Sequence, residues 1–160
     1  MDPASTPAPN LTPVTAMLGT WRGDGAGSYP TIEAFSYTEE ITFTDVGKPF
    51  LHYIQRTWAP TGAPMHTETG FLRVPADGVA EFVLAQPTGQ TELCEGRILA
   101  EADALVLEFD SRVVGSATAK EVVTTRRRYE TVGDRMITTF AMAAVGRPLT
   151  HHLRSDLRRV

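Results

Sequence analysis

Hydrophobic and polar residues alternate along most of the chain. Between residues 35 and 44 the apolar positions are Phe35, Tyr37, Ile41 and Phe43, with serine and threonine residues between them. An alternation with a period of two is typical of a half-buried β-strand. Similar runs lie at about 50–59, 64–73, 79–86, 91–99, 105–112, 121–131, 135–145 and 149–159. With a further segment at 21–27, the pattern predicts about ten short strands and almost no helix.

Short turn motifs separate these segments, such as Pro60-Thr61-Gly62 and Ala76-Asp77-Gly78. Parallel strands would need long crossover connections, for which the chain has no room, so we expect an antiparallel sheet. About ten antiparallel strands in one domain either close into a barrel or split into a sandwich. The segment Met136–Val145 is apolar on both faces. A barrel of more than eight strands would leave interior space for a large ligand beside such a strand.

The N-terminal residues differ from the rest of the chain. Residues 1–13 hold four prolines among small polar residues, a composition typical of a flexible segment. A short helical turn is expected at Leu11–Leu18, with Thr12 as its N-cap and Pro13 at the first position. We therefore expect a flexible segment at 1–13 and one domain at 14–160, a length that suits a single core.

Charge and composition exclude several classes of function. A net charge of −4 gives no electrostatic reason to expect nucleic acid as a partner. In the cluster Arg126-Arg127-Arg128, strand alternation places Arg127 opposite its neighbours, and we expect a solvated strand. No apolar run approaches the ~18 residues of a membrane span, so no membrane partner is expected.

The cysteine content and the N-terminus indicate a cellular location. Cys94 is the only cysteine, which excludes an internal disulfide and any CxxC metal site. The first residues have neither the basic nor the apolar region of a secretory signal, so a cytoplasmic location is expected.

The motif His66-Thr67-Glu68 carries the residue types of a general base or a metal pair. Residues two apart on a strand share a face, yet no third ligand follows nearby in the sequence. We therefore favour an ordinary strand with polar residues. The sequence holds no G-x-S-x-G and no H-E-x-x-H motif, so nucleophilic and zinc-dependent hydrolysis have no support.

The most distinctive motif is rich in glycine and covers residues 19–31. Its first part, Gly19-x-Trp21-x-Gly23-x-Gly25, lacks the spacing and the following helix of a phosphate-binding loop. We expect a first strand whose Trp21 plugs one end of a barrel, followed by a rigid turn at Tyr29-Pro30-Thr31.

These residues resemble the signature of the nitrobindin family. Further matches lie along the chain, at Val46–Pro49, Met65–Gly70, Ala119–Glu121 and Pro148–Leu153. The resemblance covers about residues 14–160. It implies an all-β fold, a ten-stranded antiparallel barrel shaped like fatty-acid-binding proteins and lipocalins, holding haem b near one mouth.

The resemblance also implies a set of site residues. His152 would be the axial ligand of the haem iron and thus the catalytic residue, Thr31 would lie against the haem, and Lys120 would approach a propionate. Met65 and His66 would line the pocket. The implied activity of the ferric haem protein is reversible nitric oxide binding and isomerisation of peroxynitrite to nitrate. Oligomeric state stays open, with a homodimer among the arrangements allowed.

Strand alternation alone disagrees with this choice of histidine. In a regular strand, His151 shares a face with Leu149, Leu153 and Leu157, whereas His152 shares the other face with Arg154. A bulge near Pro148 would not separate the two faces, because alternation resumes after it. One reconciliation is that Leu153 and Leu157 pack outside, against the N-terminal turn.

Two other functions stay open. The first is a haem or nitric oxide carrier or sensor without turnover. The second is a lipocalin-like binder of an apolar ligand. A haem spectrum of the purified protein would distinguish the second from the haem proteins, because a protein without haem has no Soret band.

Overall fold

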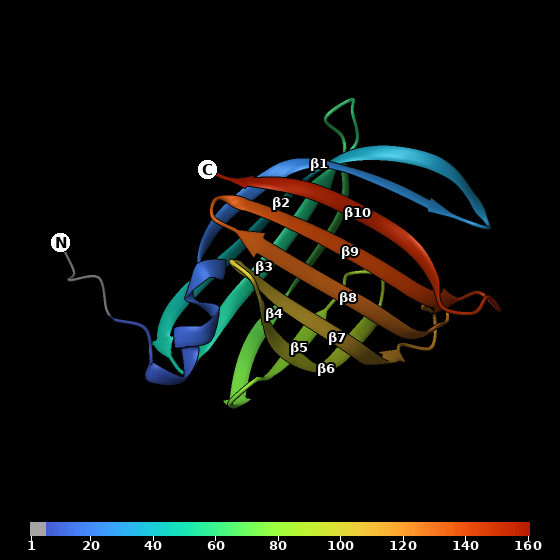
Figure 1. The fold of residues 1–160 in the computed structure, drawn as a ribbon. Helices are drawn as coiled ribbons and strands as arrows, with labels where there is room; N and C mark the ends of the chain where they lie inside the picture. Colours follow the sequence, from blue (N-terminus) through green and yellow to red (C-terminus); the bar gives the residue numbers. More distant parts are fainter. Residues whose placement is uncertain (1–5) are drawn as a thin grey trace.

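The computed structural model describes residues 6–160, which form a closed antiparallel barrel of ten strands (Figure 1). Each strand pairs with its neighbours in sequence, and β1 pairs with β10 to close the barrel. The strands are β1 (Gly19–Tyr29), β2 (Ile32–Lys48), β3 (Phe50–Trp58), β4 (Pro64–Ala76), β5 (Val79–Ala85), β6 (Gln90–Glu101), β7 (Ala104–Gly115), β8 (Val122–Val132), β9 (Arg135–Ala144) and β10 (Thr150–Arg159). The alternation therefore predicted the strands, and the closure excludes the sandwich.

A 3₁₀ helix, η1 (Pro9–Met17), covers one end of the barrel. Its Leu11, Val14 and Met17 are completely buried, and the Met17 carbonyl accepts a hydrogen bond of 2.9 Å from the Trp21 indole. The helix begins two residues before Leu11 and has no side-chain cap, in contrast to the cap expected at Thr12. The flexible segment expected at 1–13 lies in part outside the described residues.

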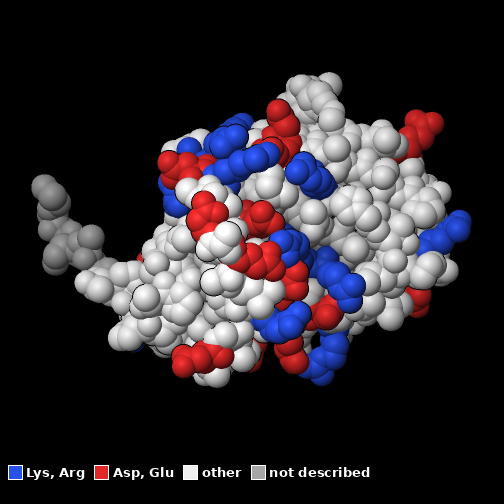
Figure 2. All heavy atoms as spheres, viewed as in Figure 1, with Lys and Arg blue, Asp and Glu red and all other residues white. Residues whose placement is uncertain are grey.

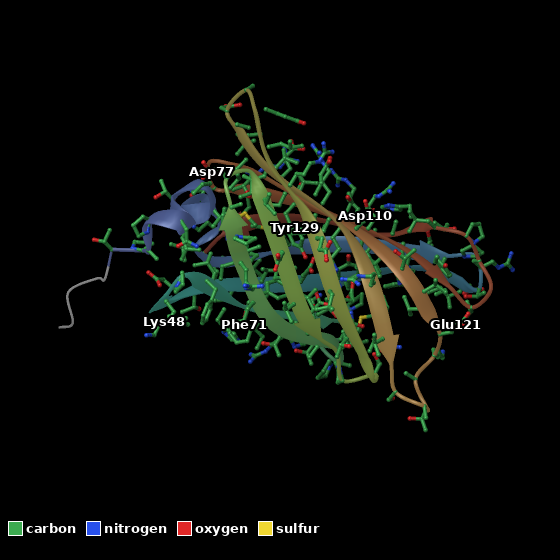
Figure 3. The ribbon with its side chains drawn as sticks, turned by 90° about the horizontal axis from the view of Figure 1, so that it is seen from below. Lys48, Phe71, Asp77, Asp110, Glu121 and Tyr129 are labelled. Carbon is green, nitrogen blue, oxygen red and sulfur yellow. The ribbon has the colours of Figure 1, made fainter. Side chains whose placement is uncertain are left out.

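Apolar side chains fill the half of the barrel beside η1. Trp21 is fully buried there and plugs the end, as the sequence predicts, while the Arg159 guanidinium lies 4.1 Å from its ring centroid. The core continues with residues from most strands, among them Ile41, Phe43, Leu51, Leu72, Phe82, Leu107, Phe109, Met136 and Leu157. Figure 3 shows Tyr129 midway along the barrel and Glu121 at the end far from the helix.

The glycines of β1 allow aromatic rings to lie directly on the strand. A Cβ at Gly25 would lie 2.2 Å from the Tyr37 ring, and a Cβ at Gly27 would lie 2.4 Å from the Phe35 ring. Any side chain at these positions would displace the rings, because real Cβ atoms do not approach so closely. The glycine signature therefore shapes the interior wall and is no phosphate loop.

The outer surface carries both signs of charge in alternation. Figure 2 shows basic and acidic side chains interleaved on the face drawn, with no patch of one sign. Cross-strand pairs such as Arg126 with Asp110 and Arg135 with Asp156 account for part of this pattern. Within residues 6–160, no helix has the length and apolar character needed to cross a membrane.

Candidate functional site

The half of the barrel far from η1 contains a cavity of about 650 Å³. This volume lies within the range of small-molecule and cofactor pockets. Turns and loops between strands form its mouth, where Ile32, Met65 and Val145 are about half exposed. The five residues expected from the family resemblance all line this one cavity: Thr31, Met65, His66, Lys120 and His152.

A β-bulge at His152 turns this side chain into the cavity. On β10, His151 pairs with Ala141 and Leu153 pairs with the next residue of β9, Phe140, so His152 is an extra residue. A bulge of this kind changes which face the following residues occupy. His151 is therefore exposed, while His152 and Leu153 both line the cavity.

The bulge corrects one expectation drawn from regular alternation, because His151 does not point inward. The reconciliation offered for His152 is also wrong: Leu153 and Leu157 do not pack outside against the N-terminal turn, and Leu157 is fully buried in the core, on the inward face that alternation predicts. The sequence reasoning considered a bulge only near Pro148, before both histidines, whereas the extra residue is His152 itself.

Hydrogen bonding fixes the tautomer of His152. Its Nδ1 lies 2.9 Å from the Ser28 carbonyl oxygen, and since a carbonyl only accepts, Nδ1 carries the proton. Nε2 then keeps a free lone pair. Burial lowers the pKa of His152 below its ordinary value, which favours the neutral imidazole that a metal ion requires.

Three aromatic rings hold the His152 imidazole from the sides. The centroid distances are 5.3 Å to Tyr29, 6.1 Å to Phe35 and 6.1 Å to Phe140. The Tyr29 hydroxyl donates to the Met142 carbonyl at 3.0 Å, which ties this ring to β9. These rings restrict the orientation of the His152 imidazole, as neighbouring groups do around histidines that bind a metal ion.

Met65 and His66 lie on the opposite wall. They belong to β4, which is separated from β10 by three strands in one direction and five in the other. The His66 Nε2 is 3.7 Å from a carboxylate oxygen of buried Glu68. Thr31 and Lys120 are exposed at the mouth, where the Lys120 carbonyl accepts a hydrogen bond of 3.0 Å from Gln90.

A buried ion-pair network crosses the barrel beneath these residues. The Arg127 guanidinium contacts Glu68 at 2.7 Å and Glu92 at 2.5 Å, and all three side chains are at most 7% exposed. Although burial alone would raise it, Arg127 holds the pKa of Glu68 well below its usual range. The solvated strand expected at 126–128 is therefore wrong for Arg127, although its neighbours face outward.

Sequence reasoning missed Glu68, Glu92 and Arg127 as interior residues. It treated His66-Thr67-Glu68 as an ordinary polar strand, yet Glu68 is 4% exposed. The alternation does indicate that two of these residues face inward, because Arg127 shares its face with Tyr129 and Glu92 shares its face with Cys94. A cation and two carboxylates on inward faces of separate strands could have suggested a buried pair.

Among its described lining residues, the cavity contains no cluster of side chains that could coordinate a bare metal ion. Within residues 6–160, no group of three or more histidine, cysteine or carboxylate side chains could hold a metal ion. A bare ion would lack ligands here, whereas a metal that arrives in a planar macrocycle needs only an axial imidazole. The free Nε2 of His152, facing an apolar-rimmed cavity, fits haem in this respect.

Comparisons with known proteins agree with this geometry. A family model described as "THAP4-like, heme-binding beta-barrel domain" matches residues 10–159. A peroxynitrite isomerase of Nocardia farcinica is 50% identical over 153 residues, covering 94% of this chain and 91% of the relative. A peroxynitrite isomerase 2 of Mycobacterium marinum is 48% identical and covers 94% of this chain and 95% of the relative.

A solved structure has the same fold. The crystal structure of Rv2717c from M. tuberculosis superposes with a TM-score of 0.94 at 44% identity, covering 97% of this chain and 99% of that one. The family model and these relatives span nearly the whole described barrel. The nitrobindin resemblance is thereby confirmed, and the chain belongs to the THAP4-like haem-binding β-barrel family.

Proposed function

We propose that this chain binds one haem b through Nε2 of His152 and that the ferric form converts peroxynitrite to nitrate. The observation that carries the proposal is the neutral imidazole whose free nitrogen faces a cavity of about 650 Å³. Two relatives that cover most of the chain are named peroxynitrite isomerase, which supports the reaction. Reversible nitric oxide binding at the same iron belongs to the same proposal.

The site residues expected from the resemblance each have a role in this proposal. The Ser28 carbonyl orients the His152 ring and makes Nε2 a better donor to iron. Lys120, exposed at the mouth, would pair with a propionate, and Thr31 would contact the haem from the β1–β2 turn. Met65 and His66 would line the side of the haem opposite His152.

The reaction requires little acid–base chemistry from the protein. Peroxynitrite and nitrate contain the same atoms and carry the same charge, so the isomerisation consumes no proton and no electron. When bound, haem supplies an iron whose open sixth position takes small ligands and can promote cleavage of the O–O bond. The chain holds His152 in place and excludes water with Tyr29, Phe35 and Phe140 around it.

Haemin titration followed by stopped-flow kinetics tests the proposal. The full-length protein should take up one equivalent of haemin and give a high-spin ferric spectrum. The loaded protein should accelerate peroxynitrite decay to nitrate, and the haem-free protein should not. No Soret shift beyond that of free haemin would favour a binder of apolar ligands. A normal spectrum with no acceleration would favour a haem or nitric oxide carrier or sensor.

A further inference from the structure

The deep end of the cavity has a polar floor that the haem proposal does not use. Glu39, Gln55, Glu68, Glu92 and Arg127 line it, at the boundary with the apolar core. All five are buried, with exposures of 7%, 6%, 4%, 1% and 6% in that order. Buried polar groups are destabilising unless they find hydrogen-bond partners, so the partners of each group determine what the floor can bind.

Arg127 is the single cation of the floor, and all of its hydrogen-bond donors are already used. The Arg127 guanidinium has five N–H donors. They go to both carboxylate oxygens of Glu68, to both carboxylate oxygens of Glu92 and to the Tyr129 hydroxyl. No donor of Arg127 is left for a ligand, so the floor has no free cation with which to hold a carboxylate or a phosphate.

The carboxylates of Glu68 and Glu92 are occupied as well. Besides Arg127, Glu68 accepts a hydrogen bond of 2.7 Å from the Tyr53 hydroxyl. Glu92 accepts one of 2.5 Å from the Thr125 hydroxyl and a further one from the Gln86 amide. These two side chains therefore form a closed network with Arg127.

Two acceptors beside that network have no partner. Gln55 donates a hydrogen bond of 3.0 Å from Nε2 to Oε1 of Glu39. The other oxygens, Oε2 of Glu39 and Oε1 of Gln55, are buried with no hydrogen bond of normal geometry. The Ser155 hydroxyl, which is bonded to the Tyr37 hydroxyl, lies close enough to Glu39 to lower its pKa. Glu39 and Gln55 belong to neighbouring strands, β2 and β3, and both side chains line the cavity. The two unpaired atoms, Oε2 of Glu39 and Oε1 of Gln55, are thus acceptors that could take a hydrogen bond from a ligand.

The charge of the floor favours a cationic donor. With Glu39 ionised, three carboxylates face one guanidinium, so the floor carries an excess of negative charge. A buried charge needs a partner of opposite sign, and unpaired charges in the interior are strongly destabilising. An ammonium group supplies both the donors and the positive charge, whereas a hydroxyl supplies a donor alone.

We propose that the floor of the cavity is a binding site for the primary ammonium end of an amphiphilic molecule, held by Oε2 of Glu39 and Oε1 of Gln55. The apolar body of the ligand lies along the upper cavity, among Phe35, Phe140 and Leu153. The proposal does not rest on haem binding. It predicts that a haem-free barrel selects amines against carboxylates of the same length.

A series of hexyl compounds tests the proposal on the full-length, haem-free wild-type protein. Isothermal titration calorimetry at pH 7 compares hexylammonium, 1-hexanol and hexanoate, which all have six carbons and carry different polar ends. We expect one site per chain, with hexylammonium at least tenfold tighter than hexanoate and hexanol between them. Equal affinities, or tighter binding of hexanoate, would overturn the proposal. Binding of none of the probes would also overturn it, because water or a proton on Glu39 would then satisfy the two acceptors.

Variants locate the site. Glu39→Gln removes the charge, and we expect at least a tenfold loss of hexylammonium affinity with little change for hexanol. Glu40→Gln is the matched control, because Glu40 is the next residue of β2 and faces outward toward Arg22. Equal losses in the two variants would contradict a site at Glu39. If Glu39→Gln fails to fold, the wild-type series still decides the proposal.

Discussion

A single extra residue in β10 determines which histidine faces the cavity. The change of register between His151 and Leu153 places His152 inside and leaves His151 exposed. The glycine at position 27 contributes from the neighbouring strand, since it leaves room for the Phe35 ring and the Leu153 side chain. Both features act on the position of one imidazole nitrogen, Nε2 of His152.

The two adjacent histidines therefore give opposite results when each is replaced by alanine. His152→Ala should abolish axial ligation of ferric haem and peroxynitrite turnover, because the bulge turns His152 into the cavity with its Nε2 free to bind iron. His151→Ala should leave the Soret band unchanged. Haemin titration monitored by absorbance checks both, and free imidazole should partly restore the spectrum of His152→Ala. Loss of the axial ligand in His151→Ala would refute the assignment.

The Glu39 carboxyl should make the stability of the protein depend on pH. Burial raises the pKa of Glu39 above its ordinary value of 4.5, although hydrogen bonds from Ser155 and Gln55 oppose part of the rise. A raised pKa in the folded state means that the contribution of Glu39 is fully present below pH 4.5 and is lost as the pH rises through the raised value. The amide in Glu39→Gln has no charge to bury.

We expect Glu39→Gln to stabilise the haem-free protein relative to wild type increasingly between pH 5 and pH 8, a window that starts just above the ordinary pKa of 4.5. Urea unfolding at several pH values measures the difference in free energy. Glu40→Gln serves as the control and should show no such trend. A Glu39→Gln advantage that shrinks as the pH rises would contradict the sign of the pKa shift.

At the scale of elements, three strands are joined inside the barrel by one guanidinium. Arg127 on β8 binds Glu68 on β4 and Glu92 on β6, and its Cζ lies 4.8 Å from the Phe140 ring of β9. The two ion pairs link strands that are not neighbours in the sheet. Removing the cation would leave two carboxylates buried without a partner of opposite charge.

Arg127→Met should lower the free energy of unfolding by about 3–5 kcal/mol, the usual effect of breaking a buried pair by removing one partner. Arg126→Met is the matched control, because its ion pair with Asp110 is exposed. Such pairs contribute at most about 1 kcal/mol. Chemical denaturation of the three proteins gives the comparison, and similar losses in both variants would show that the buried network contributes no more than a surface pair.

Alternation predicted the ten strands but left a barrel and a sandwich both open, and it could not place the interior polar residues. On β8, both faces carry polar side chains, so the pattern that separates inside from outside is weak at Arg127. The bulge at His152 is equally invisible, because an extra residue changes the register without changing the residue types. The resemblance carried by the glycine signature pointed to His152, and the bulge turns this side chain into the cavity.

The whole molecule divides into two halves along the barrel axis. The half beside η1 is solid and apolar, with Trp21, Phe43 and Leu107 fully buried. The other half encloses the cavity. The polar layer of Glu68, Arg127 and Tyr53 separates them. Stability and ligand binding should therefore respond to substitutions in different halves.

A pair of leucine substitutions tests this division. Leu11, in η1, is fully buried, so Leu11→Ala should lower the free energy of unfolding by about 2–5 kcal/mol. The haem spectrum should not change, because no residue of η1 lines the cavity. Leu153→Ala should lose less stability, since Leu153 is partly exposed, but should weaken haem binding by removing a wall contact beside His152. Urea unfolding and haemin titration of both variants measure the two effects. A shifted Soret band in Leu11→Ala would mean that the polar layer transmits packing changes from the apolar half to the cavity.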